Sequence, residues 1–391
     1  MTRSEAGPGP RTILISVSPG ETRYALLEDD TILDVAFERA GRLASGDRVA
    51  GRLGKALGGS LARFVDTGSG PAGFFEVPRA QARAYSEGQR LLFQVIREGY
   101  GSKGPKLALC REPGPDTLRA FEAGTDLGRL PGENSILSAW LRDSAGSPPE
   151  VICDSGVYLA GWTREPGKAR FASVAHHTGT TSLFEVFGVE EAIGQALEER
   201  VSLPSGGGLI FAETEALNAV DVDTGAGPRD RGALVAALET IFHQIRLRAL
   251  GGQIVIDLPR SRAHPLPADL PAVVKTLAAR DPAGMRFLGI TRGGLLELVR
   301  PRTRAPLSDL MCRRSTRQRE SSEAALLRCL RDLARGVPGA GVVLDVDDEA
   351  FRLLETVYGP AFREAVSRSG MTVRVERGLP EGASLRAAGA V

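Results

Sequence analysis

The chain has 391 residues, and its 49 lysines and arginines nearly balance its 48 aspartates and glutamates, which gives a formal charge of +1. A chain so close to neutral is not expected to coat nucleic acid through bulk positive charge. The composition, 42% hydrophobic and 25% charged, is typical of a globular protein with several domains, and it excludes the disordered and fibrous classes. The apolar run at residues 13–17 is too short for a signal-peptide core or for a membrane span of about 20 residues, so we expect a cytoplasmic protein.

The N-terminal segment predicts a β-meander, and the next seventy or so residues predict a small closed barrel such as an OB-fold, because short strands follow one another with glycine-rich turns. The meander strands are expected at residues 12–16, 22–27 and 31–37, and the barrel strands at 49–55, 61–66, 73–77, 91–96 and 107–110. Phe64 and Phe74 on neighbouring barrel strands, with Lys103 on a loop, suit base stacking and a phosphate contact. Aromatic side chains that simply fill the barrel are the structural alternative.

Residues 111–171 are rich in loop-forming residues and predict only one helix, at 135–142. A single amphipathic helix is expected over residues 183–200, before a glycine-rich turn at 201–208. This turn is not a phosphate-binding loop, since no Gly-Lys-Ser/Thr follows it and a strand comes next.

Acidic residues gather where the pattern changes to strand, helix, strand. A strand pair is expected at 208–213 and 217–223, and its alternation places Asp221 and Asp223 on the face opposite the core. A helix at 232–250 leads to an apolar strand that ends at Asp257. In such βαβ units the functional residues collect beyond the carboxyl ends of the strands, so we expect the three aspartates to meet at one edge.

Carboxylates that gather in this way favour a hard cation, Mg²⁺ or alternatively Mn²⁺, which could polarise a phosphodiester and activate a water molecule. Solvent-facing acids on a half-exposed sheet are the structural alternative. Downstream, Arg292, Arg300 and Arg302 could hold a phosphate backbone, although a solvated face would also explain them. The C-terminal residues predict helices at 323–335 and 351–367 and strands at 341–345 and 372–376, as in a packing or self-association module.

Several short motifs, taken together, resemble the catalytic core of the RNase E/G endoribonucleases. They are Leu-Pro-Ser-Gly-Gly at 203–207, Thr-Glu-Ala-Leu at 214–217, Ala-Val-Asp at 219–221, Gln-Ile-Arg-Leu-Arg at 244–248, Leu-Gly-Gly-Gln-Ile-Val-Ile-Asp at 250–257 and Gly-Leu-Leu-Glu at 294–297. The similarity extends more weakly to the meander, the barrel and a C-terminal segment near residues 322–378. It therefore covers most of the chain.

The resemblance implies an α+β multidomain fold, in which an OB-fold barrel interrupts an RNase H-like domain. The implied ranges are 1–41 and 172–208 for the RNase H-like domain, 42–112 for the OB-fold, 113–171 for a reduced 5′-sensor-like subdomain, 209–305 for a DNase I-like catalytic subdomain, 306–321 for a linker and 322–391 for a small C-terminal α/β domain. It also implies that Asp221 and Asp257 hold Mg²⁺, and that Phe64, Phe74 and Lys103 anchor single-stranded RNA. Family members cut A/U-rich single strands and leave a 5′-phosphate and a 3′-hydroxyl.

The chain departs from the family pattern at three places. Asp223 stands where the family usually has asparagine, which adds a candidate third carboxylate or water-orienting group. Cys312-Arg313-Arg314-Ser315 keeps one of the two zinc-binding cysteines, and the four scattered cysteines contain no Cys-x-x-Cys pair, so we expect no zinc and no zinc-linked tetramer, and a homodimer stays open. Cys153-Asp154 is the nearest match to an Arg-Thr pair of the family's 5′-phosphate sensor, and Asp154 would repel a phosphate.

The sequence therefore predicts a Mg²⁺-dependent endoribonuclease of RNA processing or decay. Asp221 and Asp257 are its expected metal ligands, and water attacks the phosphodiester of single-stranded RNA. The alternative is an RNA-binding protein on the same scaffold that cleaves weakly or not at all, which the altered Asp223 and the incomplete zinc pair motivate.

Overall fold

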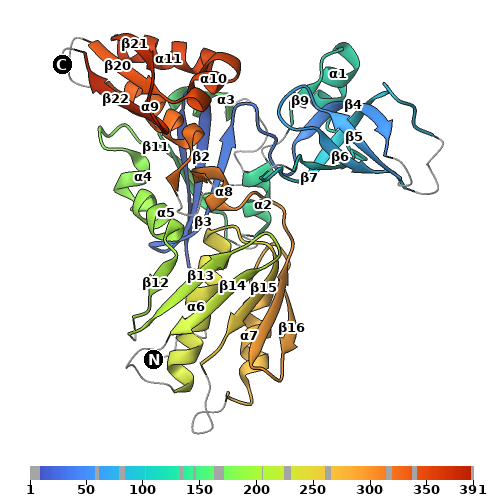
Figure 1. Cartoon of the computed structure of the whole chain (residues 1–391), viewed down its shortest axis with the longest axis vertical. Coiled ribbons are helices and arrows are strands. Elements are labelled where there is room, and N and C mark those ends of the chain that lie inside the picture. The colour runs from blue at the N-terminus through green and yellow to red at the C-terminus, as the bar shows by residue number, and fades with distance from the viewer. Residues whose placement is uncertain are drawn as a thin grey trace. The chain divides into compact units, whose positions relative to one another are not determined.

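The computed structural model describes most of the chain, and Figure 1 shows its elements in order. It describes residues 9–388 with the exception of 58–60, 79–83, 102, 133–134, 144–146, 163–170, 205, 224–229, 260–265, 314–318 and 337–340. The chain divides into two compact units. Unit 1 consists chiefly of Phe184–Leu307 with Ala25–Val35, and unit 2 chiefly of Ala36–Leu183 and Ser308–Val391 with Ile13–Tyr24.

The predicted meander is confirmed as the strands β1 (Arg11–Ser18), β2 (Glu21–Glu28) and β3 (Thr31–Arg39). Two strands that the sequence did not predict, β10 (Glu150–Cys153) and β11 (Ser173–His176), extend this sheet in the order β11-β10-β1-β2-β3. The segment predicted as loop-rich also holds α1 (Pro115–Ala123), the expected α2 (Ser135–Asp143) and α3 (Gly156–Trp162). The unpredicted elements, α1, α3, β10 and β11, are too short for a periodic apolar pattern to reveal them.

The predicted barrel is confirmed as a closed ring of five strands in unit 2, because the first strand pairs with both its neighbours in the ring. The ring consists of β4 (Arg48–Ala56), β5 (Ala62–Asp66), β6 (Gly73–Glu76), β8 (Lys106–Leu109) and β7 (Arg90–Arg97), and β9 (Gly128–Leu130) pairs with β4 outside it. Val49, Val65, Phe75, Phe93 and Leu107 fill its interior. The barrel core is thus made by alternate residues of each strand, as a two-residue period requires.

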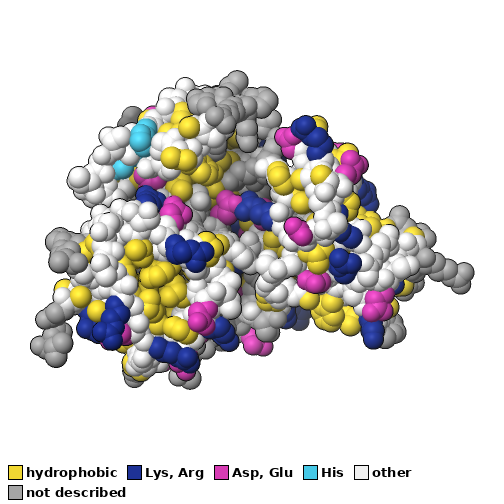
Figure 2. Space-filling view, turned by 90° about the horizontal axis from the view of Figure 1, so that it is seen from above, with side chains coloured by type: hydrophobic (Ala, Val, Ile, Leu, Met, Phe, Trp, Pro, Cys, Tyr) yellow, Lys and Arg dark blue, Asp and Glu magenta, His cyan; other side chains and the backbone are white. Residues whose placement is uncertain are grey.

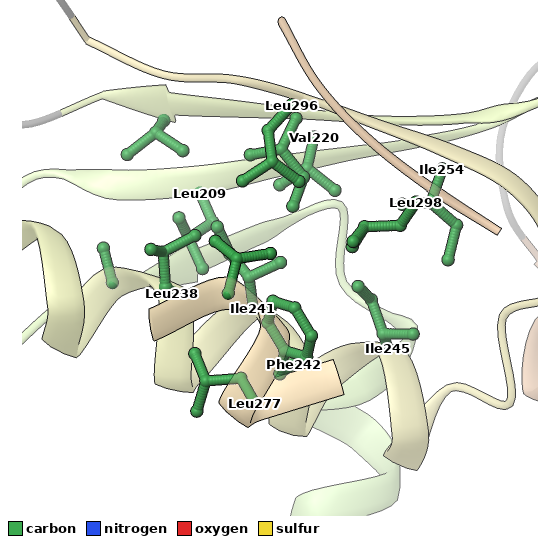
Figure 3. Close-up of a cluster of buried hydrophobic side chains, with 14 of the residues drawn as sticks. Leu209, Val220, Leu238, Ile241, Phe242, Ile245, Ile254, Leu277, Leu296 and Leu298 are labelled. Atoms are coloured by element: carbon green, nitrogen blue, oxygen red, sulfur yellow. The ribbon is translucent and has the colours of Figure 1, made fainter. Parts of the chain in front are cut away.

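A six-stranded sheet forms the frame of unit 1. Its order is β12 (Arg200–Ser202), β13 (Gly208–Glu213), β14 (Asn218–Asp223), β15 (Gly252–Asp257), β17 (Leu295–Arg300) and β16 (Arg286–Ile290). The helices α6 (Arg231–Leu247) and α7 (Leu270–Ala279) pack on one face of this sheet. Figure 3 shows Leu238, Ile241 and Ile245 of α6 directed toward Val220 and Ile254 of the strands. The opposite face carries the exposed side chains of Asp221, Asp223 and Asp257 together with half-buried apolar residues such as Val255 and Val299.

The single helix predicted over residues 183–200 is wrong, because the structure divides it into α4 (Leu183–Val186) and α5 (Val189–Leu197). Gly188 separates them with a φ of 69°, a left-handed conformation that glycine adopts without steric cost. Each helix buries an apolar side, so apolar residues recur at helical spacing across both helices. The periodicity alone therefore could not reveal the break between them.

The C-terminal part of unit 2 is a three-stranded sheet in the order β21-β20-β22 with helices packed on it. After α8 (Leu307–Met311), β18 (Cys312–Arg313) and β19 (Arg319–Glu320) come α9 (Ser322–Arg335), β20 (Gly341–Val346), α10 (Asp348–Thr356), α11 (Gly359–Ser369), β21 (Thr372–Arg377) and β22 (Ala383–Ala387). The helix predicted at residues 351–367 is therefore two helices, and the last strand was not predicted. Residues 314–318, which include Arg314 and Ser315 of the incomplete zinc motif, lie outside the described part.

Charges of both signs are interspersed over the face shown in Figure 2, and no large area of one sign is visible there. This distribution agrees with the near-neutral charge of the whole chain. Among the described residues, no helix is long and apolar enough to cross a membrane.

A buried carboxylate in unit 2 joins the N-terminal sheet to the C-terminal helices. Glu21 of β2 accepts a hydrogen bond from Arg39 Nε of β3 at 2.7 Å and another from Arg331 of α9 at 2.6 Å. Arg39 also donates to Glu323 at 3.3 Å, and Glu323 accepts from the Tyr358 hydroxyl at 2.8 Å. Burial alone would raise the pKa of Glu21, but the surrounding guanidinium groups outweigh it and hold this pKa below its ordinary value of 4.5.

We expect Glu21→Gln to destabilise the protein by about 3–5 kcal/mol, because it leaves buried guanidinium groups without their anion. The free energy of unfolding of this variant should also depend less on pH in the acidic range. The pKa of Glu21 is lower in the folded protein than in the unfolded chain, so the unfolded chain takes up a proton first as the pH falls. The contribution of Glu21 to the free energy of unfolding is therefore complete above pH 4.5 and is lost as the pH falls below it. Urea midpoints measured between neutral and acidic pH check both effects.

Glu28→Gln is the matched control, since Glu28 lies on the same strand and pairs with Arg11 near the surface. A surface pair contributes little, so this variant should keep the parent's stability and pH dependence. Equal behaviour of the two variants would contradict the role given to Glu21.

Candidate functional site

Two aspartates lie side by side on the open face of the six-stranded sheet in unit 1. Strands β14 and β15 pair in parallel, and their register sets Asp221 directly beside Asp257. Val220 and Val222 of β14 and Ile256 of β15 point into the core, so alternation turns both carboxylates to the exposed face. Of the three aspartates expected to meet at one edge, this register brings Asp221 and Asp257 side by side.

Asp223 is exposed two residues further along β14, where its register partner is Gly208 of β13. Within the described part of the chain, no group of three His, Cys, Asp or Glu side chains is close enough to hold a metal ion. The structure thus brings together two of the three predicted aspartates and does not add Asp223 to them. The residues that follow both strands, 224–229 and 260–265, lie outside the described part.

The aspartate pair has the chemistry of a divalent cation site. Among the described residues, neither Asp221 nor Asp257 has a hydrogen-bond or ion-pair partner, so their oxygens are not committed to a structural role. Like charges on neighbouring strands repel each other, which costs stability unless a cation neutralises them. Two exposed carboxylates fit a hard, oxygen-ligated ion such as Mg²⁺ that keeps several of its waters.

The three predicted phosphate-binding arginines have three different positions. Arg292 is exposed in the turn between β16 and β17 and can reach a ligand. Arg302 is half-buried and donates from Nε to the Gly251 carbonyl at 2.8 Å. Arg300 is only 5% exposed, forms an ion pair with Asp281 at 2.7 Å and donates to the Leu250 carbonyl. The contact with RNA predicted for Arg300 does not fit this buried position, and its guanidinium instead fixes a loop against β17.

Other motif residues also serve the framework of unit 1. Arg248 lies over the Phe211 ring at 4.2 Å and donates to the side chain of Gln244 and to the carbonyl of Glu198. Burial lowers the pKa of Arg248 to about 10. Asn218 donates to the Gly251 carbonyl at 3.1 Å and so fastens the start of β14 to the turn before β15. These contacts hold β14 and β15 in the register on which the aspartate pair depends.

The outer face of the barrel carries a second candidate surface, in unit 2. Phe64 of β5 and Phe74 of β6 are register partners with ring centroids 6.4 Å apart, and Phe64 is 49% exposed. Their side chains do not fill the barrel, so the structural alternative is wrong for this pair. Lys106 of β8 is the parallel partner of Phe74, which the sequence did not reveal because β6 and β8 are distant in the chain. Lys103 lies over the Tyr100 ring at 5.7 Å.

The residues matched to a 5′-phosphate sensor have local structural roles. The Cys153 side chain is buried, which raises the pKa of its thiol to about 11. The Asp154 carboxylate accepts a hydrogen bond from the Val17 amide at 2.8 Å and so ties β10 to β1. Cys312 is half-buried and forms no disulfide, and no group of described residues around it could hold a metal ion.

We expect Arg300→Leu to lower the free energy of unfolding by about 3–5 kcal/mol, because the variant leaves Asp281 buried without its cation. Arg292→Leu is the control and should leave stability nearly unchanged, since Arg292 is exposed. Chemical denaturation of both variants checks this. Equal stability of the two would show that the Arg300 ion pair does not hold the sheet.

Comparisons with known proteins agree with the resemblance of the motifs. The sequence profile of the Ribonuclease E/G family matches residues 124–303. Ribonuclease G of Haemophilus influenzae and Ribonuclease G of Escherichia coli K12 are each 25% identical to this chain over 398 residues, which covers 77% of the chain and 81% of each relative. Ribonuclease E of Buchnera aphidicola from Acyrthosiphon pisum is 32% identical over 173 residues, or 40% of the chain and 19% of that protein. The chain is thus similar to the ribonuclease E/G family, by the profile over residues 124–303 and by these relatives.

Proposed function

We propose that the chain is an endoribonuclease that hydrolyses phosphodiester bonds in single-stranded, A/U-rich RNA during RNA processing or decay. The observation that carries this proposal is the register that sets Asp221 beside Asp257 on an exposed sheet face, in a chain similar to the ribonuclease E/G family. The relatives named Ribonuclease G and Ribonuclease E support the same class of activity.

The aspartate pair is the proposed catalytic centre, and Asp221 and Asp257 would hold one divalent cation, Mg²⁺ or Mn²⁺, between their side chains. The bound ion would supply polarisation of the phosphodiester and a lowered pKa for the attacking water. The two carboxylates would hold the ion on strands whose inner face is packed, so that these ligands would need little reorganisation. Asp223, two residues further along β14, is the proposed water-orienting group beside the pair.

The barrel surface is the proposed anchor for the RNA strand. The exposed Phe64 ring and the half-buried Phe74 ring beside it are the proposed surface on which bases stack without regard to sequence, and each stacked base contributes about 1–3 kcal/mol. Lys106 and Lys103 supply positive charge for backbone phosphates. Lys106 also pairs with Glu76 at 2.7 Å, so RNA would have to compete with this carboxylate for the lysine.

Cleavage of an A/U-rich single-stranded oligonucleotide in the presence of Mg²⁺ should fall about a hundredfold or more in Asp221→Asn and in Asp257→Asn, because each loses a charged metal ligand. The readout is the rate of product formation on a denaturing gel. Glu239→Gln is the matched control, since Glu239 is an exposed acid on α6 with no place on the strand face, and this variant should cut at the parent's rate.

Two results would contradict the assignment. Undiminished cleavage by both aspartate variants would show that Asp221 and Asp257 do not hold the catalytic metal ion. RNA binding by the parent with no Mg²⁺-dependent product would instead identify a binding protein on the nuclease scaffold.

Phe64→Ala should weaken the binding of the same oligonucleotide about tenfold, which corresponds to one lost stacking contact. Fluorescence anisotropy of labelled RNA, without divalent cation to prevent cleavage, provides the measurement. Leu118→Ala removes another exposed apolar side chain from unit 2, at α1, and should bind RNA as the parent does. If both variants lose affinity equally, general changes in apolar surface rather than base stacking account for the effect.

A further inference from the structure

A row of side chains crosses the six-stranded sheet of unit 1 on the face that carries the aspartate pair. Its members are register partners from one strand to the next, and in order they are Arg200, Ile210, Asp221, Asp257 and Leu295. We call them the cross-strand row. The strands that carry the row, β12 to β15 and β17, are neighbours in the sheet (Figure 1). Only the two aspartates of the row belong to the proposed catalytic centre.

Arg200 projects from the same face of the sheet as the aspartate pair. Its neighbour in β12, Val201, packs against the core of unit 1, so alternation turns Arg200 to the open side. The partner strand gives the same result independently, because Leu209 and Phe211 are core residues and Ile210 between them is not. Residues that are directly opposite in an antiparallel pair lie on one face, so Arg200 shares the face of Ile210.

The Arg200 side chain is exposed and does not serve the framework. Among the described residues it has neither a hydrogen-bond nor an ion-pair partner. In this it differs from Arg300 and Arg302, which donate to backbone carbonyls in the turn before β15. The five N–H donors of the Arg200 guanidinium are therefore available to a ligand.

The distance between Arg200 and the aspartate pair suits two neighbouring phosphates of one RNA strand. Adjacent β-strands are about 4.8 Å apart, so the backbone of Arg200 is roughly 10 Å from that of Asp221 across β13. The long Arg200 side chain covers part of this distance, and an extended nucleotide covers the rest. Ile210, which lies between the two residues, is half-buried and uncharged, so it offers an apolar surface beneath the intervening nucleoside.

The charges along the cross-strand row fit an RNA strand that lies across the β-strands. A phosphate backbone is a polyanion, and guanidinium groups bind phosphate through two parallel hydrogen bonds. A cation held by Asp221 and Asp257 would contact one phosphate, and Arg200 would contact the next one toward β12. Leu295, the neighbour of Asp257 at the other end of the row, carries no charge. The row therefore offers one fixed positive charge, and it lies on the β12 side of the pair.

We propose that Arg200 binds a backbone phosphate of single-stranded RNA next to the phosphate that is cleaved, and so positions the strand across the sheet. This inference rests on the proposed nuclease function and adds to it a residue outside both the motifs and the three predicted arginines. Phosphate contacts carry no base preference, so Arg200 would fix the register and direction of the substrate rather than its sequence.

Fluorescence anisotropy of labelled single-stranded RNA, with the full chain and without divalent cation, measures this contact in the absence of cleavage. The variants are made in the Asp221→Asn, Asp257→Asn background, because empty carboxylates would repel the strand. Each phosphate contact with a single strand contributes about −0.7 to the slope of log K against log[salt]. We expect Arg200→Gln to bind RNA about tenfold more weakly at low salt and to lose about 0.7 from the magnitude of this slope. Arg200→Lys retains the charge and should keep the slope.

Arg286→Gln is the matched control for these binding measurements. Arg286 is exposed and is the register partner of Val299, whose side chain lies on the same open face. Val299 is four residues from Leu295, about 13 Å along β17, so Arg286 is far from the cross-strand row. The control variant should bind RNA with the affinity and the salt slope of the background protein.

Cleavage in Mg²⁺, with the aspartates intact, then places the contact relative to the reacting phosphate. An uncharged methylphosphonate at one of the two positions that flank the cleaved bond should slow cleavage by the parent about tenfold. The same substrate should not slow Arg200→Gln further, because the contact is already missing in this variant. Mn²⁺ should bind equally to the parent and to Arg200→Gln, which would show that the aspartate pair is undisturbed.

Three results would each overturn the proposal. They are an unchanged salt slope in Arg200→Gln, an equal loss of affinity in Arg286→Gln, and additive losses from the methylphosphonate and Arg200→Gln. If the parent binds RNA but cuts nothing in Mg²⁺, the nuclease function fails, whereas a loss of slope confined to Arg200→Gln still supports the contact of Arg200 with RNA. The binding and cleavage experiments thus separate failure of this inference from failure of the proposed function.

Discussion

The parallel pairing of β14 and β15 is the constraint on which the candidate catalytic centre depends. One face of both strands is filled by the helix α6, so a shift of one residue would expose Val220 and Ile256 and bury the aspartates. The cost of that shift fixes the register, and the register places Asp221 beside Asp257. The mutual repulsion of the two carboxylates is thus sustained by the core beneath them, as is common at functional sites that trade stability for chemistry.

Many arginines of this near-neutral chain serve the framework rather than an open basic surface. Several of them form ion pairs with buried acids, such as Arg39 with Glu21, Arg300 with Asp281 and the half-buried Arg304 with Asp34. Guanidinium groups suit such positions because they are planar and weakly hydrated and because they donate several hydrogen bonds at once. Much of the basic content therefore holds the framework together. The cations available to a ligand are those on open surfaces, such as Arg200 and Arg292.

The fold was predictable from the sequence wherever alternation or helical spacing was long enough to be read. The meander, the five-stranded barrel and the strand, helix, strand unit that carries the aspartates all follow from such patterns. Short elements between residues 111 and 176 were not predictable, since strands such as β10 and β11 gain their stability from pairing with β1 rather than from a local pattern. Gly188 ended α4 without interrupting the apolar spacing around it.

The candidate site was predictable in part for the same reasons. Alternation located Asp221, and the end of an apolar strand in a strand, helix, strand unit located Asp257. Composition could not distinguish Arg300 from Arg292, since a guanidinium has the same sequence signature when it is buried with Asp281 as when it is exposed in a turn. The sequence did not reveal Lys106, because only the pairing of β6 with β8 brings it beside Phe74. The ranges inferred for the individual domains stay predictions.

The central claim is that Asp221 and Asp257 together hold a divalent cation. The most direct test is the binding of Mn²⁺, followed by electron paramagnetic resonance, in the parent protein and in the Asp221→Asn, Asp257→Asn double variant. The account predicts that the parent removes Mn²⁺ from the free signal in competition with Mg²⁺ and that the double variant, folded to the same extent, does not. Equal Mn²⁺ binding by both proteins would contradict the account.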